Sequence, residues 1–365
     1  MTDGIPKIVG IKQIAAAAGI SIGTVDRALH DRPGVNPKTR SRVLKIAEKL
    51  GYRPNLAARS LKLNRRMRIA VHLPRDIASF FDPLRDGVRE AAASMHGVTV
   101  DLVFRTYPHL GEGDIRLLEE DFERDYDGLL MTPGNPMQVE PMIRRFTERG
   151  TAVVCVASDA PRSARLASVS VDAAVSGSIA AELLGTVLQS AGTVATITGD
   201  LNTFDHGEKL RGFAAALATM APHLTLIPAI ETHDSPKEAY RATLALLKRK
   251  PRPVGIYINT ANSLPVLRAI DEKAMWGRVK VVTTDLFAEL VPLIESARIL
   301  ATLYQRPFTQ GKLAFETLCR YLVENIQPEA VTRVAPHIIL RSNLPLFLER
   351  LPDILEASGD RVPAR

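Results

Sequence analysis

The sequence has few of the features that mark secreted, membrane-spanning or metal-binding proteins. Its 365 residues include two cysteines, Cys155 and Cys319, and both stand in apolar runs. This setting predicts buried thiols in a reducing compartment rather than a disulfide or a pair of metal ligands. No apolar run approaches about 18 residues, so no membrane span is expected. The first residues lack a signal-peptide core, and we therefore expect a cytoplasmic protein.

Catalytic and cofactor motifs are also missing. The chain has no G-x-S-x-G, no G-x-x-x-x-G-K-[ST], no H-E-x-x-H and no Cys/His set with metal-binding spacing. GEGDIR at 111–116 lacks the third glycine of a dinucleotide-binding loop. We therefore expect no enzyme activity, no cofactor and no metal site.

Acidic residues are scarce at the start of the chain. Residues 1–68 contain fifteen Lys or Arg against four Asp or Glu, a formal charge of +11. The whole chain carries +7, so the rest is mildly acidic, at about −4. A small basic segment on an acidic body predicts contact with a polyanion. The alternative is a solvated basic face.

The basic segment has the pattern of three short helices. Apolar spacing predicts helices over about 11–18, from Ile22, and from Pro37 to Leu50. Ser21 can cap the second helix, and Asn36 before Pro37 can cap the third. Two short helices joined by a turn at Gly19 fit a helix-turn-helix, whose second helix enters the DNA major groove. An ordinary three-helix core fits the apolar residues equally well but does not account for the charge.

A further short helix is expected over about 54–66. Pro54 breaks the preceding segment, and Asn55 can cap a helix of about eight residues, LAARSLKL. A helix of that length is not stable alone in water. We expect it to form only when another molecule braces it.

The first 61 residues contain motifs of a known family. The series TVDRAL, VNPKTRSRV and AEKLGYRPNLAARSL stands in order over some fifty residues and closely resembles the N-terminal domain of LacI/GalR-type transcription regulators. The resemblance implies a homodimer that reads a palindromic operator, with Leu56 of a hinge helix opening a base step in the minor groove. It implies DNA contacts by Ser21, Ile22, Gly23, Thr24, Arg27, Asn36, Leu56 and Arg59. Asp26 departs from the family's usual serine.

From residue 67 onward, apolar strands alternate with helical runs. The strands are expected at 68–74, 98–104, 127–132, 151–157, 193–199, 253–259 and 279–285. Helices are expected between them, among others at 82–95, 173–190 and 236–249. This alternation predicts parallel sheets covered on both faces, and the length favours two lobes.

Ligands bind such sheets beyond the carboxyl ends of the strands. Two adjacent aromatic residues, several amides and one carboxylate follow the predicted strands: Phe80, Phe81, Asn135, Asn259, Asp285 and Gln305. Aromatic faces suit the C–H side of a sugar ring, while amides and carboxylates bind its hydroxyls. We expect Asp285 at the mouth of a cleft between the lobes. Taken singly, these residues are also typical of turns or of a core.

The body also resembles the ribose-binding group of periplasmic-type sugar-binding proteins over nearly its whole length. The matching segments are FFDPLRDGVREAA, DGLLMTP, KLRGFAAAL, TTD and ATLYQRP. The resemblance implies that Phe80 and Phe81 flank a ligand ring. It also implies hydrogen bonds to the ligand from Asn135, Lys209, Asn259, Asp285 and Gln305. Lys209 stands where the group commonly has arginine, and His206 is either a ligand contact or part of a helix start.

The sequence therefore predicts an all-α helix-turn-helix head at 1–53, a hinge helix and linker at 54–66, a two-lobed α/β body with parallel sheets at 67–345 and a tail at 346–365. The predicted function is a transcription regulator, most often a repressor, that binds operator DNA under control of a sugar-like effector. A solute-binding protein without a DNA role is the alternative. The C-terminus has no sustained heptads, so a homodimer is preferred to a coiled-coil tetramer.

Overall fold

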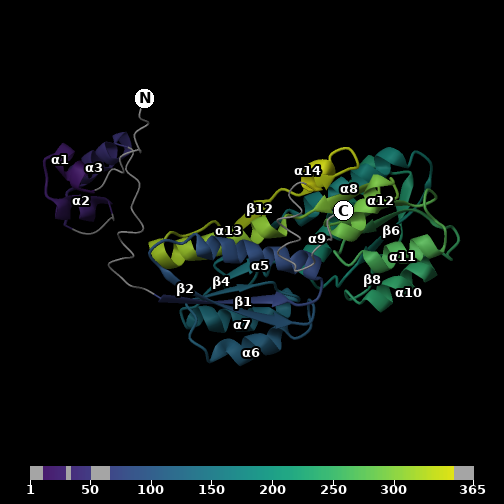
Figure 1. The fold of residues 1–365 in the computed structure, drawn as a ribbon, viewed down its shortest axis with the longest axis horizontal. Coiled ribbons are helices and arrows are strands. Elements are labelled where there is room, and N and C mark those ends of the chain that lie inside the picture. Colours follow the sequence, from purple (N-terminus) through teal and green to yellow (C-terminus); the bar gives the residue numbers. More distant parts are fainter. Residues whose placement is uncertain (1–10, 30–33, 51–65, 349–365) are drawn as a thin grey trace, which may run out of the picture. The chain divides into compact units, whose positions relative to one another are not determined.

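The computed structural model describes residues 11–29, 34–50 and 66–348. The chain divides into two compact units, one formed by 1–66 with 95–99 and one formed by 67–94 with 100–365 (Figure 1). We call residues 1–66 the head and residues 67–348 the body, and each is described by itself. The predicted hinge helix with Leu56 and Arg59 lies outside the described residues, as does the tail from 349.

The head contains the three predicted helices, α1 (Ile11–Ala18), α2 (Ile22–Leu29) and α3 (Pro37–Lys49). Gly19 takes a φ of 64°, which allows the tight turn between α1 and α2. The N–H of Thr24 donates to Ser21 Oγ at 3.1 Å, and the N–H of Lys38 donates to Asn36 Oδ1 at 2.8 Å. Both predicted helix starts are therefore confirmed.

Small apolar side chains hold the three helices together. The buried core of the head consists of Ile14, Ala15, Val25, Ala28, Val43 and Ala47. On α2, Val25 and Ala28 turn inward, whereas Ile22 is 50% exposed. Ile22 thus belongs to the outer face of α2, although its spacing also fits the apolar stripe.

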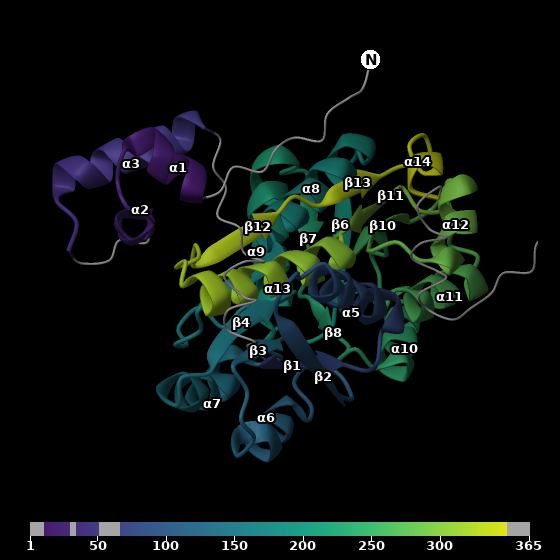
Figure 2. The same cartoon turned by 60° about the vertical axis from the view of Figure 1, so that its left-hand side comes forward.

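The first lobe of the body is built on a sheet with the order β12-β5-β4-β3-β1-β2. All strand pairs from β12 to β1 are parallel. The strands are β1 (Arg66–Pro74), β2 (Thr99–Tyr107), β3 (Gly128–Met131), β4 (Ala152–Val156), β5 (Ala167–Val171) and β12 (Val331–Val334). Helices α5 (Ala78–Ala93) and α13 (Pro307–Glu324) lie side by side on one face (Figures 1 and 2), and α6 (Asp114–Phe122) and α7 (Pro136–Glu148) cover the other.

The second lobe has a sheet of order β13-β11-β10-β9-β6-β7, with β8 also pairing with β6. Its pairs are parallel except that the edge strand β13 runs antiparallel to β11. The strands are β6 (Gly192–Thr198), β7 (Leu224–Leu226), β8 (Ile230–Glu231), β9 (Pro253–Ile258), β10 (Lys280–Thr284), β11 (Ala301–Tyr304) and β13 (His337–Ile339). The helices are α8 (Ala173–Val187), α9 (Phe204–Met220), α10 (Pro236–Leu246), α11 (Leu264–Glu272), the 3-10 turn η1 (Ala288–Leu290), α12 (Val291–Glu295) and α14 (Pro345–Leu348).

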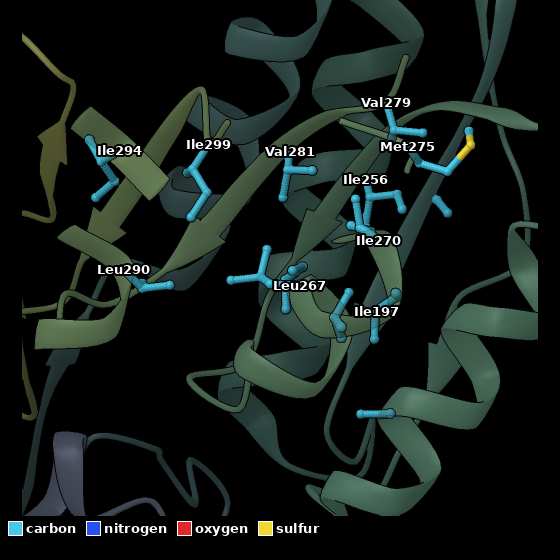
Figure 3. Close-up of a cluster of buried hydrophobic side chains, with 14 of the residues drawn as sticks. Ile197, Ile256, Leu267, Ile270, Met275, Val279, Val281, Leu290, Ile294 and Ile299 are labelled. Atoms are coloured by element: carbon cyan, nitrogen blue, oxygen red, sulfur yellow. The ribbon is translucent and has the colours of Figure 1, made fainter. Parts of the chain in front are cut away.

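The central strands of the second lobe, β6, β9, β10 and β11, are buried on both faces over most of their length, which explains their near-continuous apolar sequence. In β9, Ile256 and Ile258 enter the cluster beneath α10 and α11, while Tyr257 enters the cluster beneath α8 and α9. Figure 3 shows the first of these clusters, in which side chains from the strands meet Leu267 and Ile270 of α11.

Each lobe pairs two helices at very short range through glycines. A Cβ at Gly177 of α8 would lie 1.9 Å from the carbonyl oxygen of Lys209, and one at Gly212 of α9 would lie 2.0 Å from that of Ala174. In the first lobe, Gly87 of α5 and Gly311 of α13 face carbonyl oxygens at 2.0 and 2.1 Å. Only glycine permits backbones to approach so closely.

The chain passes between the lobes three times. It crosses at Asp172 between β5 and α8, at 305–306 between β11 and α13, and at 335–336 between β12 and β13. The crossings lie in a row, because β12 pairs with β5 in one sheet and β13 pairs with β11 in the other. Neither lobe is therefore continuous in sequence.

Both cysteines are free and buried, as predicted. Burial raises the pKa of each thiol to about 12, which keeps them protonated and unreactive. Within the described ranges, no helix has the length and apolar character needed to cross a membrane.

Candidate functional site

A cavity opens between the two lobes of the body, beyond the ends of their strands. It encloses about 420 Å³ of space that is partly open to solvent, and we call it the inner cavity. Its lining comes from both lobes: Ile77, Phe80, Phe81, Leu110, Thr132, Ala157, Ser158, Thr203, Asp205, His206, Lys209, Asp234, Thr260, Ala261 and Gln305. Five of the predicted ligand residues are among them, namely Phe80, Phe81, His206, Lys209 and Gln305.

The apolar wall of the inner cavity comes from the start of α5. Phe80 and Phe81 are 6% and 3% exposed, and their rings meet edge to face with centroids 4.9 Å apart. Edge-to-face pairing fixes the two rings against each other. The pair gives a rigid aromatic surface at which the C–H face of a small ring can lie.

Lys209 forms the polar centre of the opposite wall. Its Nζ lies 2.6 Å from Asp205 Oδ2 one turn earlier on α9, 2.8 Å from Gln305 Oε1 and 3.5 Å from the carbonyl oxygen of Asn259. The side chain is 1% exposed. A buried ammonium group is tolerated only when acceptors surround it, and here three acceptors do.

The predicted position of Asp285, at the mouth of the cleft, is wrong. Asp285 is 2% exposed and is not among the lining residues. Its carboxylate accepts hydrogen bonds from the backbone N–H and from Nε2 of Gln305, at 3.1 and 2.7 Å. Burial raises the pKa of Asp285 to about 6, against the opposing effect of nearby Lys209. Asp285 therefore does not line the cavity itself but holds the side chain of Gln305, which does.

Two predicted amides also lie away from the inner cavity. Asn135 accepts hydrogen bonds from the backbone N–H groups of Met137 and Gln138 and so caps α7. Asn259 is fully buried, and its Nδ2 donates to the carbonyl oxygen of His206 at 3.2 Å. Asn259 thus positions the first turn of α9, which carries Asp205 and His206.

Several lining residues carry polar atoms that have no partner in the described part of the chain. These atoms are Thr132 Oγ1, Ser158 Oγ, Thr203 Oγ1 and Asp205 Oδ1, and each belongs to a residue no more than 7% exposed. Buried polar atoms are normally hydrogen-bonded, so these atoms are available to a ligand. Short hydroxyl side chains after strands look like ordinary turn residues in a sequence, and no motif distinguishes them.

A second, larger cavity adjoins the first and shares Ile77, Asp234 and Ala261 with it. We call it the outer cavity. It encloses about 800 Å³, again partly open to solvent. Its charged lining residues are Asp76, Asp234 and Glu289, so its electrostatic character is acidic.

In the head, the outer face of α2 carries the predicted DNA contacts. Ile22, Gly23 and Arg27 are exposed and lie opposite the buried Val25 and Ala28. Ser21 Oγ and Thr24 Oγ1 lie 2.8 Å apart at the start of α2, and Asn36 stands at the start of α3. This face of α2 is exposed, including residues near its N-terminus, and no described residue covers it, as major-groove recognition requires.

Comparison with known families divides the chain in the same way. A model of bacterial regulatory proteins of the lacI family matches residues 10–55, and a model of the periplasmic binding protein domain matches residues 69–325. The chain is 24% identical to catabolite control protein A of Priestia megaterium, covering 91% of this chain and 97% of that protein. It is 25% identical to the transcriptional repressor PurR of Vibrio atlanticus, covering 92% and 98%.

Solved structures resemble the body. A solute-binding protein of Burkholderia graminis in complex with D-arabinose has a TM-score of 0.70 at 23% identity, covering 77% of this chain and 97% of that chain. A solute-binding protein of Agrobacterium vitis bound with α-D-tagatopyranose has a TM-score of 0.71 at 18% identity, covering 76% and 96%. At these identities the likeness establishes the two-lobed fold.

Proposed function

The chain belongs to the lacI family of bacterial regulatory proteins, a DNA-binding transcription regulator with a periplasmic binding protein domain, and we propose that a polyhydroxylated effector bound in its inner cavity controls its affinity for an operator. The observation that carries the proposal is a set of buried polar atoms, without partners in the described part of the chain, on residues that line the same cavity as an aromatic pair. The DNA-binding head distinguishes this chain from solute-binding proteins that share only its body.

The proposed DNA contacts follow the outer face of α2 and the caps of α2 and α3. Ile22, Gly23 and Arg27 face base edges, while Ser21, Thr24 and Asn36 hold phosphates or the helix start. Leu56 and Arg59, outside the described residues, complete the set. We propose a cytoplasmic homodimer whose two heads read a palindrome in the major groove.

The proposed effector contacts combine an apolar wall with convergent polar groups. Phe80 and Phe81 cover the C–H side of a ring, and His206, Gln305 and the unpartnered hydroxyls bind its OH groups. A site built from such groups rejects analogues that lack a hydroxyl, because its own buried atoms then stay unpaired. The sugars held by the structural relatives support this assignment of class.

Control of DNA binding follows from thermodynamic linkage. A ligand that binds between two lobes favours one angle between them. It changes the affinity for DNA only by its differential binding to the two arrangements. The effector releases the operator or strengthens operator binding, according to which arrangement of the lobes it favours.

A thermal-shift screen of sugars, polyols and sugar acids against the full chain tests the proposal, followed by gel shifts on a palindrome selected from random DNA. The best hit should raise the melting temperature and change the fraction of operator bound. A screen without any hit, or a hit that leaves operator binding unchanged, would argue against effector control.

Two matched threonines test the assignment of the pocket. Thr203 and Thr196 both have buried hydroxyls without a partner among the described residues, but of the two only Thr203 lines the inner cavity. Thr203→Val should lower affinity for the hit about tenfold, as expected for one lost hydrogen bond of about 1–1.5 kcal/mol. Thr196→Val should leave this affinity unchanged. Calorimetric titration of both variants with the hit makes the comparison. Equal effects of the two variants would contradict the assignment.

A further inference from the structure

Lys209 is the one lysine among the described residues that line the inner cavity, and all three of its N–H donors have acceptors within the protein. An ammonium group carries three N–H bonds, and Lys209 Nζ has three acceptors within 3.5 Å, on Asp205, Gln305 and Asn259. The described residues that line the cavity include no arginine. An anionic group entering this space would therefore meet a cation that the protein has already neutralised.

Asp234, in contrast to Lys209, is a buried charged residue without a partner of opposite charge among the described residues. It is 8% exposed and lies where the inner and outer cavities meet. Its Oδ1 accepts a hydrogen bond from Thr260 Oγ1 at 2.6 Å. Among the described residues, no Lys, Arg or His nitrogen lies within 4.0 Å of this carboxylate. A buried carboxylate without a cation is costly, and proteins normally pair such a charge.

The surroundings increase the negative potential at this junction. Asp205 Oδ1, in the inner cavity, is buried and has no partner in the described part of the chain. In the outer cavity, Glu289 is exposed and adds a further carboxylate, and Asp76 is partly offset by Arg75 at 3.4 Å. His206 is the other lining residue that can carry positive charge, and its Nδ1 lies 3.1 Å from the carbonyl oxygen of Asp200.

We propose that the effector carries a protonated amine on its polyhydroxylated body and that this amine pairs with Asp234. The inference rests on the proposed function and narrows it to amino sugars or similarly aminated polyols. An ammonium group supplies the missing cation and forms a charge-assisted hydrogen bond, which is stronger than a neutral one. Sugar acids and sugar phosphates are rejected, because they place a like charge beside an unpaired carboxylate.

Matched sugar sets separate charge from shape. Each set consists of an amino sugar, its neutral parent and the acid that keeps the same ring: glucosamine, glucose and glucuronate, with equivalent galacto and manno sets. Calorimetric titration of the full chain at neutral pH should find the amine at least tenfold tighter than its parent in the set that binds, equal to about 1.4 kcal/mol. The acid should bind more weakly than both.

An isosteric variant tests the residue itself. Asp234→Asn keeps an oxygen for the Thr260 hydroxyl but removes the charge, so affinity for the amine should fall about tenfold while the neutral parent stays within about twofold. Asp125→Asn, at an exposed acid in the loop before β3, is the matched control. It should change neither the affinity for the amine nor the affinity for the neutral parent. Operator binding without sugar should persist in both variants and shows that they fold.

The outcomes distinguish this inference from the function on which it rests. A neutral parent or an acid that binds as tightly as the amine overturns the amine proposal and leaves the polyol effector standing. An amine preference that survives Asp234→Asn overturns the role of Asp234. If no member of any set binds while operator binding persists, the amine proposal fails, and the wider screen of sugars and polyols decides the polyol effector separately.

Discussion

Gln305 joins two buried charges of opposite sign. Its Oε1 accepts from Lys209, and its Nε2 donates to Asp285. The amide can satisfy both only in one orientation, because its oxygen accepts and its nitrogen donates. Gln305 also lies in one of the three crossings between the lobes. A ligand that contacts this side chain therefore contacts a segment that connects the two lobes.

Asp285 should make stability depend on pH in the acid range. Its pKa of about 6 exceeds about 3.9 for an unfolded aspartate, so the folded state binds the proton first. The free energy of unfolding then falls as pH rises from about 4 to about 6 and levels off above. Between pH 4 and 7, the free energy of unfolding measured in urea should fall by about 1–3 kcal/mol more in the wild type than in Asp285→Asn. Parallel pH profiles of the two proteins would refute this expectation.

Arg27 should determine sequence preference rather than general affinity for DNA. It is exposed on the outer face of α2, near the residues expected to meet base edges. Arg27→Ala should weaken specific operator binding by about 1–3 kcal/mol and relax the preference at one base position. Gel shifts on operator and on random DNA measure this difference. Equal losses on both would place Arg27 on the DNA backbone.

Residue types decide how much of the site the sequence predicts. Phe80, Phe81 and Gln305 were predictable because aromatic and long polar side chains after apolar strands are uncommon as turn residues. Lys209, which lies inside α9, was predicted only from the resemblance to sugar-binding proteins. Asp234 and the hydroxyl residues were not, since short polar side chains are equally typical of turns. Asn135 illustrates the converse error, because a helix cap has the same sequence signal as a ligand contact.

At the scale of helices and strands, apolar runs were a reliable guide. Strands β3, β4 and β9 coincide with predicted runs to within one or two residues. Strand β5, with the sequence ASVSV, was missed because alternate serines break its apolar pattern. The edge strands β12 and β13 are short and partly exposed, so tertiary pairing rather than their own composition forms them.

The close pairing of α8 and α9 gives a prediction with an internal control. Gly212→Ala places a methyl group 2.0 Å from a backbone oxygen and must push the helices apart, at a cost of about 1–3 kcal/mol. Gly207, on the same helix, has its nearest contact at 3.3 Å. Gly207→Ala should stay within about 1 kcal/mol of wild type, because alanine also favours the helix.

Denaturant unfolding of both variants makes the comparison. A similar midpoint for Gly212→Ala and Gly207→Ala would show that the two helices can separate without loss. Because Asp205 and His206 of α9 line the inner cavity, a shift of this helix should weaken effector binding in Gly212→Ala more than in Gly207→Ala.

For the whole molecule, effector and operator should influence each other by the same factor. If the effector lowers operator affinity by a given ratio, saturating operator must lower effector affinity by that ratio, since both report one coupling free energy. Such ratios typically lie at about 5–150. Effector titrations of the full chain with and without the selected palindrome measure how much the operator changes the effector affinity. Unequal ratios would mean that the two ligands do not share a simple cycle of states.

The threefold crossing of the chain between the lobes also constrains how genes of this kind can recombine. The head is one contiguous stretch, so a single breakpoint near residue 66 exchanges it whole. The first lobe is encoded in separate pieces, about 67–171 and 307–334, with the second lobe interleaved. No single breakpoint transfers a complete lobe together with its half of the cavity. DNA specificity can thus change by exchange of a module, whereas effector specificity must change through substitutions in place.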